Sequence, residues 1–107
     1  SARCYADCLQ AAWEGGFWRE WFHGLWHLPR TLAHQRRPQA AALLMGFAEA
    51  FYTDRFGTLG AADRHEARRT RRLARRQLGA AREAALWSEG RAMEMAAAMR
   101  LALQEAA

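Results

Sequence analysis

The sequence predicts an all-α protein in which a short N-terminal helical hairpin and a third helix pack on a long, arginine-rich C-terminal helix. The 107 residues include no Val and no Ile, which favour strands, whereas Ala, Leu, Glu, Arg and Met are abundant. Hydrophobic residues make up 51% of the chain, enough to build a folded core. Residues 1–107 are expected to form one domain, with an aromatic-rich core over residues 1–57 and the long basic helix over residues 58–107.

Two short helices joined by Gly15-Gly16 are expected at the N-terminus. Residues 2–13 place their apolar side chains on one face of a helix. Residues 17–28 form the second helix, which Pro29 is expected to close. The apolar face of this helix is too wide for a surface helix. This helix therefore lies either in the core or in an oligomer interface. Its rings include Trp18, Trp21, Phe22 and Trp26.

The third helix is expected over residues 39–56, after a polar linker over residues 30–37, with Pro38 at its start and Gly57 at its end. From Asp63 onward no proline interrupts the chain, and small residues recur at heptad spacing. This pattern predicts a helix of about 66 Å, with a bend or break at Gly90 as the alternative. The small-residue seam needs a cover, and we expect a homodimer to provide it. The seam comprises Ala74, Leu78, Ala81, Ala85, Ser88, Ala92, Met95, Met99 and Ala102.

Two cysteines and two histidines share one spacing in the predicted hairpin. Cys4 and Cys8 are four residues apart, as are His23 and His27, so each pair projects from one side of its helix. A chain reversal at Gly15-Gly16 would bring all four together as a Cys₂His₂ set, which suits a structural zinc ion. The alternative is that the cysteines only pack and the histidines are solvated.

The strongest functional signal is a run of arginines over residues 63–82, which holds eight of the sixteen basic residues of a chain with net charge +5. On a helix these side chains gather on one arc, opposite a narrow apolar seam that faces the fold. Such an arc attracts phosphates, so we expect nucleic-acid binding, DNA or RNA, by a small regulatory or accessory protein. The expected contact residues are Arg64, Arg68, Arg69, Arg71, Arg72, Arg75 and Arg76.

An acidic protein partner is the alternative, because Trp and Arg dominate the energetic centres of protein interfaces. In that case the chain would be an inhibitor, an adaptor or an assembly subunit. We expect no enzymatic activity, since there is no glycine-rich phosphate loop and no recognisable catalytic set. No apolar run is long enough to span a bilayer, and no signal peptide is visible, so we expect a cytoplasmic protein.

Overall fold

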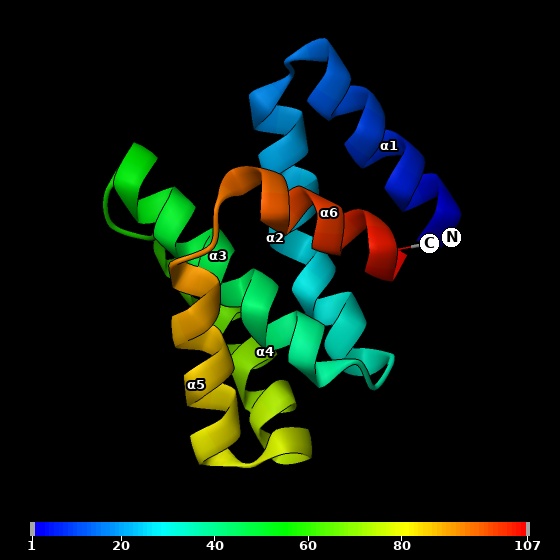
Figure 1. The fold of residues 1–107 in the computed structure, drawn as a ribbon. Helices are drawn as coiled ribbons and strands as arrows, with labels where there is room; N and C mark the ends of the chain where they lie inside the picture. Colours follow the sequence, from blue (N-terminus) through cyan, green and yellow to red (C-terminus); the bar gives the residue numbers. More distant parts are fainter. Residues whose placement is uncertain (1, 107) are drawn as a thin grey trace.

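The computed structural model describes residues 2–106, apart from the side chains of residues 2–5, and this part of the chain contains only helices and turns (Figure 1). Its helices are α1 (Ala2–Gly15), α2 (Trp18–His34), α3 (Pro38–Phe56), α4 (Ala61–Leu78), α5 (Ala80–Arg91) and α6 (Met95–Ala106). The all-α prediction is therefore confirmed. None of the described helices combines the length and apolar character that crossing a membrane requires.

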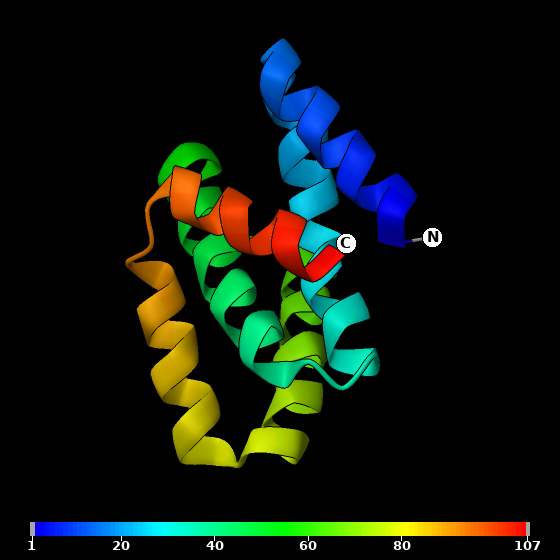
Figure 2. The same cartoon turned by 45° about the vertical axis from the view of Figure 1, so that its right-hand side comes forward.

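Helix α3 lies between two groups of neighbours (Figures 1 and 2). On one side, at the bottom of both views, α4 and α5 form a hairpin, and both of its helices pack against α3. On the other side lies α2, which contacts α1, α4 and α6 as well as α3. Helix α6 crosses this upper half and contacts α1, α2 and α3. The chain therefore wraps its basic second half around the aromatic first half.

Helix α2 is longer than the sequence predicts. It passes through Pro29 and ends at His34, whereas Pro29 was expected to end it. A proline inside a helix costs about 3 kcal/mol, because it removes a hydrogen bond and its ring crowds the preceding turn. Leu28 and Pro29 itself are buried, and so are Leu32 and Ala33 beyond it. Burial of this last turn offsets the unfavourable local effect, so tertiary packing overrides the local signal.

The prediction of one long C-terminal helix is wrong. Helix α4 ends at Leu78, since Gly79 adopts a φ of +88°, a left-handed conformation that glycine reaches without a steric penalty. A second turn after Arg91 separates α5 from α6. The reversal at Gly79 places Leu86 and Ala74 in one buried cluster with Ala42 of α3. Folding back therefore buries, within one chain, apolar surface that a continuous helix would leave exposed.

Gly90, the predicted break point, lies inside α5 at its closest approach to α3. A Cβ built on Gly90 would collide with the carbonyl oxygen of Leu43. Gly46 of α3 likewise faces the backbone of α5, because a Cβ there would collide with the carbonyl oxygen of Trp87. Both glycines are needed for backbone-to-backbone packing of the two helices. Gly90 therefore brings helices together and does not end one.

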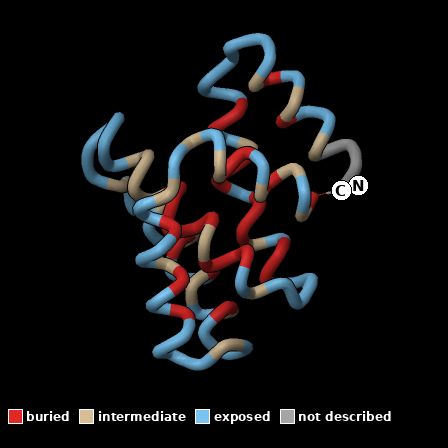
Figure 3. Tube along the Cα trace, viewed as in Figure 1, coloured by how far each residue is buried: buried red, intermediate tan, exposed pale blue. Residues whose placement is uncertain are grey.

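The core is centred on Trp21, which is fully buried (Figure 3 shows the burial along the chain). Its indole ring contacts the rings of Trp13, Phe47 and Phe51, with centroids 5.3, 6.4 and 5.8 Å away. Its N–H donates to the sulfur of Met99 in α6 at 2.9 Å. Trp21 thus connects α1, α2, α3 and α6. An aromatic-rich core in the first half of the chain was the prediction, and α6 contributes to it as well.

The small-residue seam is used within the chain. Ala74, Met99 and Ala102 are buried against other helices of the same molecule. Ala81, Ala85 and Ser88 lie on the exposed side of α5. The seam is therefore divided between the core and the exposed side of α5, and it does not form the continuous stripe that suggested pairing with a second copy. The homodimer therefore stays a prediction, and the small-residue seam no longer supports it.

Candidate nucleic-acid interface

Helix α4 has a sharp division between a buried and an exposed side. Arg and Ala are strong helix formers, and Asp63 in the first turn complements the positive end of the helix dipole. The buried side consists of small residues, Ala67, Thr70 and Ala74, which let α4 lie close to its neighbours. The sequence predicts that the side opposite the arginines faces the fold, and the burial of these three residues on that side confirms the orientation of the helix.

The exposed side of α4 carries six arginines, and we call these residues the arginine face. Between residues 64 and 76, His65 is the one exposed residue that is not an arginine. None of the exposed residues of α4 is acidic. The surface is therefore strongly positive, and the carboxylates nearest to it are the buried Glu83, 3.8 Å from Arg75, and the half-buried Asp63 beside Arg64. The arginine face comprises Arg64, Arg68, Arg69, Arg72, Arg75 and Arg76.

The acidic residues near α4 are turned toward other arginines. Glu66 pairs with Arg30 of α2, with 3.2 Å between Oε2 and Nη1. Glu83 of α5 is fully buried, and both of its oxygens accept hydrogen bonds from Arg71, at 2.8 and 3.0 Å. One nitrogen of Arg75 also lies 3.8 Å from Glu83. These pairs leave the carboxylates inside the helix packing and the other arginines facing outward.

Arg71 does not belong to the arginine face, although the helical spacing placed it on the predicted arc. Its side chain is mostly buried, paired with Glu83, and its guanidinium lies 4.1 Å from the ring centroid of Trp87. Arg91 lies over the same ring at 4.8 Å, and the indole N–H of Trp87 donates to Glu49 of α3 at 2.7 Å. Arg71 is thus the polar connection between α4 and α5.

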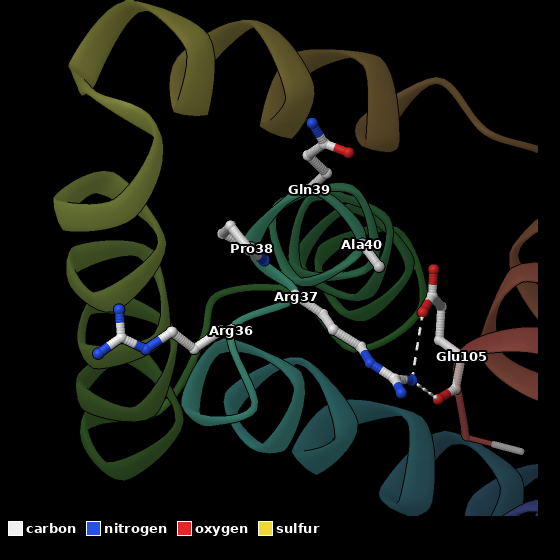
Figure 4. Close-up of a pocket in the computed structure, with 6 residues that line it drawn as sticks. All are labelled: Arg36, Arg37, Pro38, Gln39, Ala40 and Glu105. Carbon is white, nitrogen blue, oxygen red and sulfur yellow. Dashed lines mark hydrogen bonds and ion pairs between the residues drawn. The ribbon is translucent and has the colours of Figure 1, made fainter.

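The turn between α2 and α3 carries two further arginines, Arg36 and Arg37, and lies close to the end of α4. The amide of Gln77 donates to the carbonyl of Ala33 at 2.8 Å, which places the ends of α4 and α2 together. In Figure 4 the side chain of Arg36 extends on the side where α4 lies, whereas Arg37 points the opposite way. Arg37 donates to the backbone oxygen of Glu105 at 2.6 Å and pairs with its carboxylate at 3.4 Å. Arg36 therefore extends the positive surface onto this turn, and Arg37 anchors α6.

The predicted zinc site is not tested by the structure, because the side chain of Cys4 lies outside the described residues. Cys8, His23 and His27 are exposed, and the two imidazole centroids are 4.8 Å apart. Among the described side chains, no three His, Cys, Asp or Glu residues are grouped so that they could hold a metal ion. The Cys₂His₂ site stays a prediction, and metal analysis of protein purified without chelator would test it.

No family model, curated protein or solved structure matches this chain. Sequence reasoning found the arginine face but missed the network around Trp87. Helical spacing shows which residues share a face, but it does not show that Glu83 faces Arg71 once the chain has reversed at Gly79. In the sequence, Gly79 was the only indication of this reversal.

Proposed function

We propose that this protein binds nucleic acid and that the arginine face of α4 contacts its phosphate backbone. The observation that carries the proposal is the six outward-facing arginines without an exposed carboxylate on the same helix. Fixed positive charge of this kind releases the counterions condensed on nucleic acid, which favours binding without requiring a particular base sequence.

The dimensions of the arginine face suit a polyanion. Arg64 and Arg76 are twelve residues apart, which corresponds to about 18 Å along a helix. Duplex DNA carries roughly ten negative charges over that length. A single carboxylate or a small anion would use only a fraction of this surface. The spacing therefore supports a long anion over a small ligand.

The alternative partner is an acidic protein, and the burial of the aromatic residues argues against it. An interface built on the tryptophan-rich segment would expose its rings, but Trp21, Phe22 and Trp26 are buried. The large rings that stay exposed are Phe17, its neighbour Trp18, and Phe56 at the end of α3. The rings are thus mainly used by the core, whereas the arginines are free of it. This division favours the nucleic-acid proposal.

Three substitutions in the middle of the arginine face provide the test, namely Arg68→Gln, Arg72→Gln and Arg76→Gln in one variant. These side chains are exposed and make no ion pair with Glu83, so the fold should be retained. We expect nucleic-acid affinity to fall by about tenfold or more at moderate salt. Glutamine keeps the helix propensity of arginine, so circular dichroism should be unchanged.

The matched control removes three exposed arginines from other helices, Arg55, Arg91 and Arg100, also by substitution with Gln. Both variants lower the formal net charge from +5 to +2, because each loses three positive charges. A specific interface predicts a large loss of affinity for the first variant and a small loss for the second. Equal losses would show that only net charge matters, and they would refute the proposal for α4. If the unaltered protein bound an acidic protein but no nucleic acid, the alternative partner would be favoured.

A further inference from the structure

An aromatic pocket lies beside the start of α4 and is not part of the arginine face. Its volume is about 280 Å³, below the range typical for drug-sized ligands, so it suits a single planar ring system. Helices α2, α3 and α4 all contribute to it, which makes it a built feature of the fold. The lining residues are Arg19, Phe22, His23, Trp26, His27, Tyr52, Phe56 and Asp63.

The rings of the pocket are arranged around Phe22 and Tyr52. Trp26 lies 5.5 Å from Tyr52 and 5.9 Å from Phe22, measured between ring centroids. Phe56 lies 5.5 Å from Tyr52 and 6.1 Å from Phe22, yet its ring is 64% exposed. A large apolar ring that stays in water next to other rings has an unused stacking face. The pocket therefore offers a surface on which a flat aromatic ligand can stack.

Polar groups in the pocket suit a base more than a phosphate. Trp26 is 97% buried, and its indole N–H has no hydrogen-bond partner among the described residues. Because that nitrogen has almost no accessible surface, Trp26 offers its ring to a base, and the polar contacts come from the other lining residues. Asp63 would repel a phosphate but accepts hydrogen bonds from exocyclic amines. Arg19 and the two histidines supply planar groups of the kind that stack on unpaired bases.

The pocket is continuous with the proposed phosphate contacts. Asp63 lines the pocket, and the arginine face begins at the next residue, Arg64. Arg68 follows Arg64 about 6 Å further along the helix. On the other side Arg30 of α2 pairs with Glu66, so the histidine-bearing surface of α2 runs alongside α4. A strand that lies on the arginine face therefore meets the pocket at the N-terminal end of α4.

We propose that this pocket receives an unpaired nucleobase of a single-stranded nucleic acid whose phosphates lie on the arginine face. The inference rests on the proposed function and makes it more specific, because bases within a duplex are not free to enter. Stacking on aromatic side chains is the usual way in which proteins hold unpaired bases, and it tolerates any base. The pocket thus predicts a preference for single strands over duplex.

The test compares Phe56→Ala with Phe17→Ala. Both rings are similarly exposed, at 64% and 60%, but only Phe56 lines the pocket. Binding is measured by fluorescence anisotropy with three labelled probes: a single-stranded 12-mer, the same strand with abasic sites, and the matching duplex. We expect Phe56→Ala to weaken single-strand binding about 5- to 100-fold and to leave duplex and abasic binding unchanged. Phe17→Ala should leave all three unchanged, and thermal melts should show both variants folded.

The outcomes separate this inference from the proposed function. Equal single-strand affinity for Phe56→Ala and the unaltered protein would overturn the base pocket, and so would equal effects of the two phenylalanine variants. If the triple arginine variant nevertheless bound nucleic acid more weakly, the proposed phosphate contacts would still be supported. Failure of the unaltered protein to bind any of the probes at low salt would overturn the proposed function itself, and the pocket proposal with it.

Discussion

The close crossing of α3 and α5 gives a sharp prediction for the substitution Gly90→Ala. The new Cβ would overlap the carbonyl oxygen of Leu43 and would lie 2.7 Å from its carbonyl carbon and 2.9 Å from its Cα. All three atoms belong to the backbone, so no side chain can rotate away. Ordinary contact begins at 3.4 Å, so the helices must separate by at least roughly 0.7 Å to clear the carbon, and by more to clear the oxygen.

The expected magnitude follows from that separation. A gap of 0.5–1 Å forfeits about a quarter to a half of the dispersion energy of each contact along the crossing. Overpacking of this kind destabilises proteins by about 1–3 kcal/mol, and occasionally more. Alanine is favoured over glycine in a helix by up to about 1 kcal/mol, but the position next to the last residue of α5 reduces that gain. We therefore expect a net loss of about 1–3 kcal/mol, equivalent to a melting temperature lowered by roughly 4–20 °C.

The assay is chemical unfolding followed by circular dichroism, with Gly60→Ala as the control. No heavy atom lies within 4 Å of a Cβ at Gly60, and its φ of −67° suits alanine. The smaller unfolded-state entropy of alanine and its weaker capping roughly offset each other, so stability should change by less than about 0.5 kcal/mol. If Gly90→Ala were as stable as the control, the close α3–α5 crossing would be refuted.

Two further stability predictions come from buried residues. Glu83→Ala leaves the guanidinium of Arg71 without its partner and should lower the free energy of unfolding by about 2–4 kcal/mol, at the low end for a buried pair because Arg71 keeps some access to water. Glu105→Ala breaks the more exposed pair with Arg37 and should lower it by less than about 1 kcal/mol. Equal effects of the two substitutions in urea unfolding would contradict this difference. Trp21→Ala removes the fully buried centre of the core and should cost about 3–5 kcal/mol, whereas unchanged stability would place that ring at the surface.

The sequence was sufficient to predict elements whose local signals agree with their packing. Gly16 and Gly57 both adopt positive φ at the turns where breakers were expected, and Pro38 begins α3. The orientation of α4 followed from its seam, because only one side of that helix offers Ala67 and Ala74 to the core. The basic face was predictable for the same reason.

The sequence was not sufficient where a residue has more than one acceptable environment. Gly79 and Gly90 are both single glycines within helical patterns, and each costs a similar amount in a helix. Their different roles depend on what lies opposite: Gly79 has open space around it, and Gly90 faces the backbone of Leu43. Pro29 is a further case, since the burial of residues on both sides of it decides that α2 continues.

The same limit applies to the candidate site. Arg71 sits at the edge of the arc that helical spacing defines, and a partner on α5 determines that it turns inward. The aromatic pocket combines residues from three helices, so no spacing within one helix could reveal it. Phe56 and Asp63 gave no signal of their own. Contacts between helices can be predicted only when the path of the chain is known. In the second half of the chain, the turn at Gly79, with its positive φ, largely determines that path.

The central claim is tested most directly by the salt dependence of nucleic-acid binding, measured by fluorescence anisotropy from about 50 to 200 mM salt. Six exposed arginines allow a slope of log affinity against log salt as steep as about −5 for duplex and about −4 for single strands. We expect slopes between about −3 and these limits, made less negative by about 2–3 in the variant that carries Gln at residues 68, 72 and 76. Absence of binding at 50 mM salt, or a slope near zero, would contradict the assignment of the arginine face as a phosphate-binding surface.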